Sequence, residues 1–479
     1  MRGAAATSVG TWGGQLISWI STFYVARILT PGDYGIVAMG SVFVGLVGLL
    51  NEFGIGSGIV RFQKLTPAVV SGVAGLSLIF GFLGGLVVVA GAWPVAQFYR
   101  TPELVPVLAT QGLSLFVSSI RTVPLGLLRR DLQFRAAAAN DFWAVASLSV
   151  LMIVFALLGF GYWSLVLGGL FSAVVSTVLA YRLRPVRPAW PAVEGVREVV
   201  ELGGHIVVQR LLWYGYNNAD FLVAGRVFGK VATGAYSFGW NLVTGPVSKI
   251  TALVPKVATP VFAAHQGDPE GLRRFFRLAT EGLSLLSFPA AAGLALVSRD
   301  LVIGLLGDKW EAAIAPMQAL AVLAAVRGVS PIFPPLLNMT GHQRAVTQNG
   351  VLSVIVMPLG FILGSRWGLA GIAWAWAVCF PLVTTNLLVR SLRAIEMSGA
   401  QYLAVLRPAV VSTAVMIALV LLAQRGMAGV HPVARLVGAI AVGALGYAAT
   451  LLLVFRSRVD AIVRGLRGAL GNRRPEPAT

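Results

Sequence analysis

The sequence predicts an all-α, polytopic membrane protein with about fourteen transmembrane helices in two six-helix lobes plus a C-terminal helix pair. Of the 479 residues, 57% are hydrophobic and only 11% are charged, and the mean hydropathy is +0.81. Uncharged segments of about 20 residues recur along the chain, each long enough to cross a hydrocarbon core as a helix. A helix satisfies its own backbone hydrogen bonds where water is absent, so lipid is the expected solvent.

The apolar segments predict spans at 9–29, 36–58, 68–93, 104–126, 140–159, 161–183, 204–225, 233–262, 278–298, 312–337, 346–364, 368–390, 404–424 and 432–455. The first segment is too long for the apolar core of a signal peptide, and we expect it to be retained. The eighth span contains Pro246, Pro255 and Pro260, which predict a bend or a break.

The longest polar interruption, at 184–203, divides the chain into two lobes. We therefore expect an N-lobe at 1–183, a cytoplasmic linker at 184–203 and a C-lobe at 204–393. Spans 13 and 14 then occupy 394–456, and a basic tail occupies 457–479. The segments 25–35 and 223–236 resemble each other, and each joins the first two spans of its lobe. Chance similarity between two turns is the alternative to an internal repeat of the kind from which many transporters are built.

The net charge of +19 comes from basic residues in short loops between spans and in the tail. A nucleic-acid binder would gather them on a soluble face with aromatic platforms, so this distribution favours topology and attraction to anionic membrane lipid instead. A cytoplasmic N-terminus places most of the basic residues inside. We therefore predict a multi-pass protein of the cell membrane with both termini in the cytoplasm.

The sequence contains no pattern typical of a resident cofactor or metal. Its only cysteine is Cys379, its four histidines are scattered, and no phosphate-binding loop is present. We expect no cofactor and no ATP hydrolysis, so the energy should come from an H⁺ or Na⁺ gradient, the membrane potential or consumption of the product.

Three segments carry a resemblance to a known family, namely 25–39 (VARILTPGDYGIVAM), 51–58 (NEFGIGSG) and 217–226 (NNADFLVAGR) followed by Gly234-Ala235-Tyr236. They resemble Wzx-like polysaccharide flippases, of the lipopolysaccharide biosynthesis type, in the multidrug/oligosaccharidyl-lipid/polysaccharide exporter superfamily. The resemblance implies two lobes around a central cavity that opens alternately to the two faces. It also implies a polyprenyl-linked oligosaccharide as substrate, with glycosyltransferases and polymerase or export machinery as partners.

Ionisable residues inside spans are costly, so each is a candidate for function. The candidates are Glu52, Arg121, Arg210, Asp220, Lys249, Lys256, Glu281 and Arg327. Most are basic, which suits a cavity that receives a pyrophosphate.

We predict that the substrate is bound by Arg210, Tyr214, Asn217, Lys249, Lys256 and Arg327. The first three share one helical stripe, on which a cation, a phenol and an amide meet phosphate and sugar. The alternative is that these side chains join the span to neighbouring helices. Lys249 and Lys256 lie two turns apart, and for Lys256 an interfacial position is equally open. Asp220 and Glu52 are predicted to bind a coupling ion or to balance a neighbouring charge.

Two other functions compete with this interpretation. A multidrug antiporter of the same superfamily would need an acidic cavity for cationic drugs, whereas basic residues prevail inside these spans. A membrane-embedded polysaccharide polymerase would carry a large outer loop, whereas the loops here are short. We therefore predict a transporter that translocates a lipid-(pyro)phosphate-linked oligosaccharide by alternating access, and not an enzyme.

Overall fold

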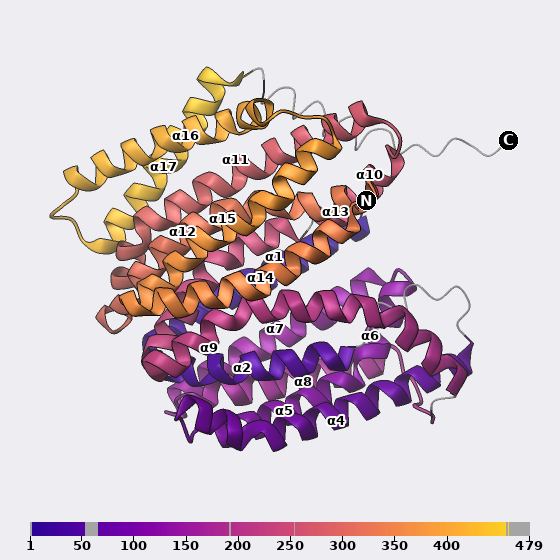
Figure 1. Cartoon of the computed structure of the whole chain (residues 1–479). Coiled ribbons are helices and arrows are strands. Elements are labelled where there is room, and N and C mark those ends of the chain that lie inside the picture. The colour runs from indigo at the N-terminus through magenta and orange to yellow at the C-terminus, as the bar shows by residue number, and fades with distance from the viewer. Residues whose placement is uncertain (1, 53–65, 191–192, 253, 457, 459–479) are drawn as a thin grey trace. The chain divides into compact units, whose positions relative to one another are not determined.

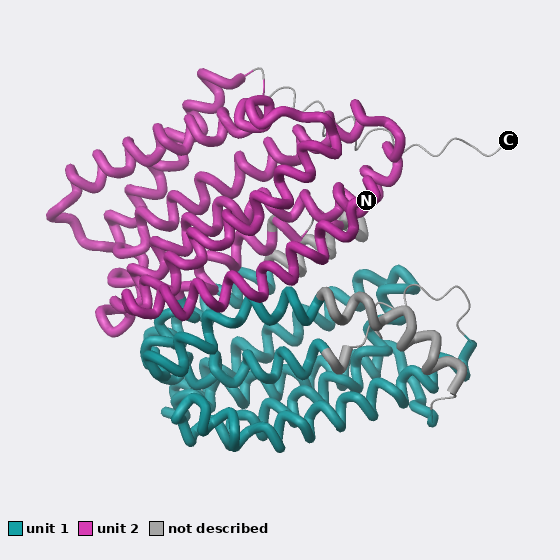
Figure 2. The backbone as a smooth tube through the Cα atoms, in the orientation of Figure 1, with its two compact units in different colours: residues 1–238 teal, residues 239–479 magenta. Residues whose placement is uncertain are grey.

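The computed structural model describes the chain except residues 1, 53–65, 191–192, 253, 457 and 459–479. Every regular element in this described part is a helix, as Figure 1 shows. The helices form two compact units, residues 1–238 and residues 239–479 (Figure 2). The first is called unit 1 and the second unit 2. The predicted lobe boundary at 184–203 remains a prediction.

Unit 1 is a bundle of helices. Its helices are α1 (Arg2–Ile28), α2 (Pro31–Glu52), α4 (Pro67–Tyr99), α5 (Leu104–Ile120), α6 (Thr122–Arg130), α7 (Phe134–Leu157), α8 (Trp163–Leu183) and the first part of α9 (Val193–Thr251). The fourth predicted span is thus two helices, which part at Arg121. The helix α9 begins inside the segment predicted as the linker.

Small residues set the spacing of the helices in unit 1. A Cβ atom on Gly85 of α4 would lie 2.9 Å from the carbonyl oxygen of Gly112 in α5, so the two backbones nearly touch. Such close approach is a common way to gain dispersion contacts between membrane helices. Around this line, Met39, Val88 and Leu108 are fully buried and form the apolar core of the unit.

The chain between α8 and α9 is attached to the start of α4. The backbone N–H of Ala189 donates to the carbonyl oxygen of Ser71 over 2.9 Å. Gly75 leaves room for the same segment, because a Cβ there would lie 1.9 Å from the oxygen of Ala189. The α4 helix itself begins at Pro67 with Thr66 as its N-cap, whose side chain accepts from the N–H of Val69.

Unit 2 contains the end of α9 and a second set of long helices. These are α10 (Val254–Ala264), α11 (Pro269–Leu301), α12 (Ile314–Val329), α13 (Phe333–Met339), α14 (Gln343–Gly364), α15 (Gly368–Ala394), α16 (Gly399–Gly426) and α17 (Pro432–Val454). A π-helical turn at Val302–Leu306 and a 3-10 turn at Asp308–Ala313 connect α11 to α12. The predicted break in the eighth span is confirmed, because α9 ends at Thr251 and α10 begins at Val254.

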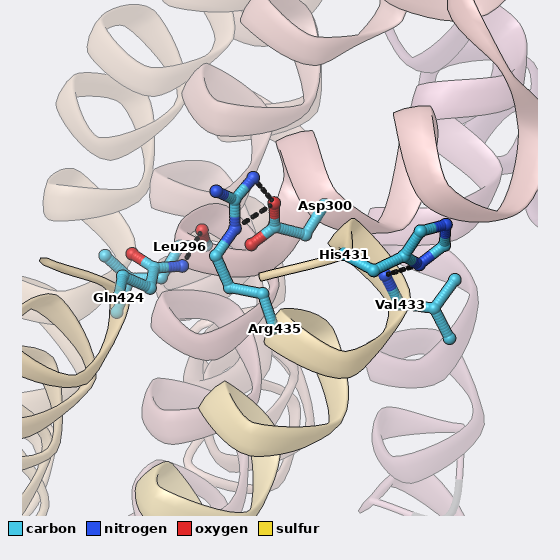
Figure 3. A network of polar contacts seen from close by, with 6 residues as sticks. All are labelled: Leu296, Asp300, Gln424, His431, Val433 and Arg435. Atoms are coloured by element: carbon cyan, nitrogen blue, oxygen red, sulfur yellow. Dashed lines mark hydrogen bonds and ion pairs between the residues drawn. The ribbon is translucent and has the colours of Figure 1, made fainter. Parts of the chain in front are cut away.

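An ion pair ties the C-terminal helix pair to the rest of unit 2. Arg435, near the start of α17, donates through Nε and Nη2 to Oδ1 of Asp300 at the end of α11, and the Nε contact measures 2.8 Å (Figure 3). Nearby, the Gln424 side chain of α16 donates to the carbonyl oxygen of Leu296 over 3.0 Å. Thus both appended helices are joined to α11 by polar contacts inside an otherwise apolar bundle.

The number of membrane crossings agrees with the sequence. Ten stretches of the described chain are long and apolar enough to span a bilayer, and one of them contains both α14 and α15. The helix α1 and the two halves of α9 lie outside these ten, and counting them separately gives about fourteen crossings. The prediction of an all-α, multi-pass membrane protein is therefore confirmed.

Candidate functional site

The helix α9 carries most of the residues predicted to bind substrate, and it changes direction at Gly229. This glycine has φ 76° and ψ −174°, a conformation that residues with a Cβ avoid. The bend falls between the two predicted spans 204–225 and 233–262. Residues 210–220 therefore lie on the arm before the bend, and Lys249 lies on the arm after it.

The Tyr214 side chain binds a neighbouring helix in unit 1. Its hydroxyl donates to the carbonyl oxygen of Val42 in α2 over 2.8 Å, with that of Ser41 at 3.2 Å. Gly45 leaves the space, because a Cβ there would lie 2.2 Å from this hydroxyl. Asn217, one turn further, is buried and its amide donates to the carbonyl oxygen of Trp213. The Tyr214 bond matches the alternative interpretation, in which the stripe joins helices, whereas the Asn217 bond lies within α9.

Asp220 is fully buried in unit 1. The hydroxyl of Tyr236, from the second arm of α9, donates to Oδ2 of Asp220 over 2.7 Å, and the N–H of Phe221 lies 2.9 Å from Oδ1. The ring of Phe221 meets that of Tyr236 edge to face. The carboxyl group therefore bridges the two arms of α9 across the bend.

The two similar sequence segments, 25–35 and 223–236, lie against each other. A Cβ on Gly35 would lie 1.8 Å from the carbonyl oxygen of Lys230, and a Cβ on Gly234 would lie 1.6 Å from that of Pro31. Each glycine thus meets the carbonyl four residues before the other, which is the reciprocal pattern of a local two-fold axis. This arrangement favours the internal repeat over chance similarity.

The other predicted residues are placed as follows. Arg210 is half-buried on α9, Lys249 is exposed near the end of the same helix, and Lys256 belongs to α10. Glu52 is the last residue of α2. The side chains of Glu52 and Lys256 lie outside the described part of the structure.

Arg327 of α12 lies among three aromatic rings in unit 2. Its guanidinium carbon is 5.3 Å from the ring centroid of Trp240, 5.1 Å from that of Trp376 and 5.5 Å from that of Phe380. Trp376 and Phe380 are one turn apart on α15, and Trp240 comes from the last part of α9. We call these three rings and Arg327 the aromatic cage. The electrostatic attraction between the guanidinium of Arg327 and the faces of the three rings stabilises this cation inside the helix bundle.

A cavity of about 140 Å³ opens beside the same helices. Its walls are mostly apolar, with Val326 and Val329 of α12, Phe288 of α11 and Leu388 of α15 among them, and Thr384 and Tyr402 supply hydroxyl groups. Arg327 and the cavity thus share α12 and α15. The sequence predicts the role of the cation but not its rings, although the spacing of Trp376 and Phe380 by four residues indicates that they share one helix face.

Comparisons with known proteins identify similar folds and similar sequences. By fold, the chain is similar to the inward closed conformation of the lipid II flippase MurJ, with a TM-score of 0.76 and 11% identity over 95% of this chain and 99% of that one. It is also similar to the inward-facing conformation of a multidrug resistance MATE transporter of the MOP superfamily, with a TM-score of 0.64 and 16% identity over 80% and 94%. The chain therefore shares the fold of these two proteins.

By sequence, residues 24–315 match the model of the family described as polysaccharide biosynthesis protein. Similar proteins include the lipopolysaccharide biosynthesis protein WzxC of Escherichia coli, 25% identical over 73% of this chain and 72% of that protein. The teichuronic acid biosynthesis protein TuaB of Bacillus subtilis is 24% identical over 79% of each. The chain belongs to the polysaccharide biosynthesis protein family and is a Wzx-like member of the exporter superfamily. The predictions of a transporter rather than an enzyme, and of the family itself, are confirmed.

Proposed function

We propose that this protein translocates a polyprenyl-(pyro)phosphate-linked oligosaccharide across the cell membrane by alternating access, with both termini in the cytoplasm. Membership of a family named for polysaccharide biosynthesis supports the substrate class. The similarity of fold to a lipid II flippase supports the mode of action. Partners would be the glycosyltransferases that build the substrate and the machinery that polymerises or exports it.

The aromatic cage is the observation that carries this proposal. A charge in the middle of a membrane-spanning helix costs about 2.5–3.5 kcal/mol on insertion scales. Each aromatic contact returns about 0.5–2 kcal/mol, so three rings offset much of that cost. An arginine stabilised in this way stays charged and can bind a phosphate of the substrate. The aromatic rings of the cage can in addition stack on the faces of sugar rings. The cavity on the same two helices offers room for an apolar part of the substrate.

The experiment tests Arg327 in a strain that lacks its own flippase. Expression of the wild-type chain with a matching glycan pathway should restore surface glycan and remove the accumulated lipid-linked intermediate, whose mass identifies the substrate. Arg327→Ala should reduce export by about tenfold or more, because losing a charge-assisted contact to phosphate costs at least 1.5 kcal/mol. Arg327→Lys should retain part of the activity, since the charge remains.

The control is Arg366→Ala, which removes an exposed arginine of unit 2 at the 3-10 turn before α15. It should export like the wild type at equal membrane level. Export by Arg327→Ala at the wild-type rate would refute the role of the cage, and lack of export by the wild type would refute the function.

One observation favours a second candidate, a multidrug antiporter. The multidrug export protein MepA of Staphylococcus aureus is 21% identical over 71% of this chain and 81% of that protein. Resistance to cationic drugs on expression, without any effect on glycan, would support that function instead. The basic character of the cage opposes it.

We further propose that Asp220, with Glu52 as the other carboxyl candidate, binds a coupling H⁺ or Na⁺. Asp220 lies between the two arms of α9, so a change in its charge would act on the bend. Asp220→Asn should leave export insensitive to a collapsed ion gradient. Unchanged sensitivity in this variant would contradict the assignment.

A further inference from the structure

One end of unit 1 carries a group of contacts between the turn that joins α4 to α5 and the bend of α9. The Nζ atom of Lys230 donates to Oε1 of Glu103 over 2.6 Å. The guanidinium of Arg226 lies 6.0 Å from the ring centroid of Phe98. Beneath them, the ring of Tyr99 packs against Gly225, where a Cβ would lie 2.4 Å from the ring. Residues 225–230 of α9 thus meet the end of α4 and the turn that follows it, at residues 98–103.

The glycine contact between α2 and α9 lies at the same end. Gly35 and Gly234 leave no room between the backbones, since any Cβ on either would overlap a carbonyl group of the other segment. Such a contact excludes water and solute, but it depends on dispersion, which falls steeply with distance. The contact therefore closes the space between α2 and α9 while it is formed. Once the two helices have separated, it exerts little attraction between them.

The ion pair has the opposite character. The two side chains are 40% and 36% exposed, so water reaches them and both ions keep part of their hydration. An exposed pair of this kind contributes only about 0–1 kcal/mol. However, it acts over a longer range than van der Waals contact. A weak, hydrated pair can therefore close and open without the cost of exposing a buried charge.

The turn between α1 and α2, the turn between α4 and α5 and the bend of α9 lie on the same side of the membrane, because helical crossings alternate in direction. With a cytoplasmic N-terminus, this side is the outer one. The segments joined here belong to the predicted N-lobe on one hand and to the start of the predicted C-lobe on the other.

We propose that the Glu103–Lys230 ion pair is the latch that holds the outer end of unit 1 closed above the glycine contact, and that release of cargo to the outside requires this pair to separate. The proposal rests on the proposed function, because it assumes that cargo leaves on the outer side. It assigns to these two residues a role in gating and none in binding the sugar.

The first test locks the latch. In a Cys379→Ser background, which removes the only cysteine, Glu103→Cys and Lys230→Cys are combined and joined in cells by a short bifunctional methanethiosulfonate reagent. Glycan export should fall to the level of the empty strain and return when a reductant cleaves the link. Each single cysteine variant, treated in the same way, should export normally. Full export by the crosslinked protein would overturn the proposal.

The second test weakens the latch and reads the closed state directly. Ala224 is fully buried beside Gly225, so Ala224→Cys reports access from outside to a membrane-impermeant maleimide. Lys230→Glu should raise the labelling rate about two- to fivefold, the range set by an exposed ion pair. The double exchange Glu103→Lys with Lys230→Glu should return the rate to that of the parent. A rate unchanged by Lys230→Glu, or an exchange that restores nothing, would overturn the latch.

A matched ion pair provides the control. Arg184 and Asp131 also pair in unit 1, over 3.0 Å, but on the side that the N-in topology places in the cytoplasm. Asp131→Lys should leave the labelling of Ala224→Cys unchanged. If the wild type exports nothing, the proposed function fails, while the labelling rates still decide on the latch. If it exports normally and the locked protein does too, the latch alone fails.

Discussion

Unit 1 and unit 2 use the space between their helices differently. In unit 1, Gly35 and Gly234 bring two backbones into direct contact, and Tyr214 fills the room left by Gly45. In unit 2, the space between α12, α15 and the end of α9 is filled by rings around Arg327, and a cavity remains beside them. The first arrangement leaves no space between the helices, whereas the second places a charge among rings and leaves a cavity on the same helices.

Polar residues that look alike in the sequence have different surroundings in the two units. Arg210, Tyr214 and Asn217 form a stripe typical of a binding surface, yet the tyrosine and the asparagine both donate to backbone carbonyl groups. Arg327 lies in an apolar segment of the sequence, yet its guanidinium is placed among three aromatic rings. We therefore expect substitutions in unit 1 to act mainly on stability and conformation, and those in the aromatic cage to act mainly on transport.

The largest expected effect comes from filling the backbone contact of unit 1. Gly234→Leu should abolish the folded protein, because its Cβ alone would overlap the carbonyl of Pro31 and the rest of the side chain adds more volume. The measurement is the yield of monodisperse protein in detergent. Gly215→Leu, on the same helix with nothing within 4 Å of its Cβ, is the control and should fold. Equal yields would contradict the close contact.

A smaller effect is expected from the ion pair of unit 2. Asp300→Ala removes the buried carboxylate that binds Arg435, and the loss of a hydrogen bond to a charged group costs about 1.5–3 kcal/mol. The thermal midpoint in detergent should fall clearly. Glu311→Ala, which removes an exposed acid from the neighbouring 3-10 turn, should leave it unchanged. A midpoint insensitive to Asp300→Ala would show that apolar contacts alone hold α17.

Tyr214→Phe distinguishes a tyrosine that joins two helices from one that binds the sugar. Removing the hydroxyl breaks the bond to Val42 and should cost about 1 kcal/mol of stability, with transport per folded molecule unchanged. Reduced transport at wild-type stability would instead return Tyr214 to the binding site. Tyr24→Phe, at an exposed position of α1, is the control.

The smallest effect concerns pH and the outer end of unit 1. The hydrogen bond from Lys230 is the main cause that lowers the pKa of Glu103 below its ordinary value of 4.5. A lowered pKa stabilises the folded state above the unfolded value, and this contribution is lost as pH falls through the folded pKa. Wild type should therefore exceed Glu103→Gln by at most about 1 kcal/mol at neutral pH. The difference in thermal midpoint should shrink as pH falls below 4.5 and vanish once pH is below the lowered pKa of the folded state, and a constant difference would exclude ionisation as its cause.

The sequence predicts the fold well because the bilayer imposes simple rules. Length and apolarity locate helices such as α16 and α17 to within a few residues, and the prolines of the eighth span predict the break before α10. The similarity of segments 25–35 and 223–236 anticipates a repeat, and the reciprocal glycine contact gives it a geometry.

The site is less predictable because it depends on contacts between distant segments. Glu103 and Lys230 are 127 positions apart, and nothing in either segment identifies its partner. The three rings around Arg327 come from two helices, α9 and α15, that are far apart in the sequence. Whether Tyr214 meets a sugar or a carbonyl depends on Gly45, which is one of 55 glycines in the chain.

The hydrogen bond between Ala189 and Ser71 has a mechanical consequence. It fixes the connection between α8 and α9 to the first turns of α4, so only four peptide links separate this anchor from Val193, where α9 begins. Fully extended, four links span at most about 14 Å. The beginning of α9 is thus tethered to α4 by a short connection. Any movement of this end of α9 within unit 1 is therefore limited by the length of these four links from the anchored Ala189.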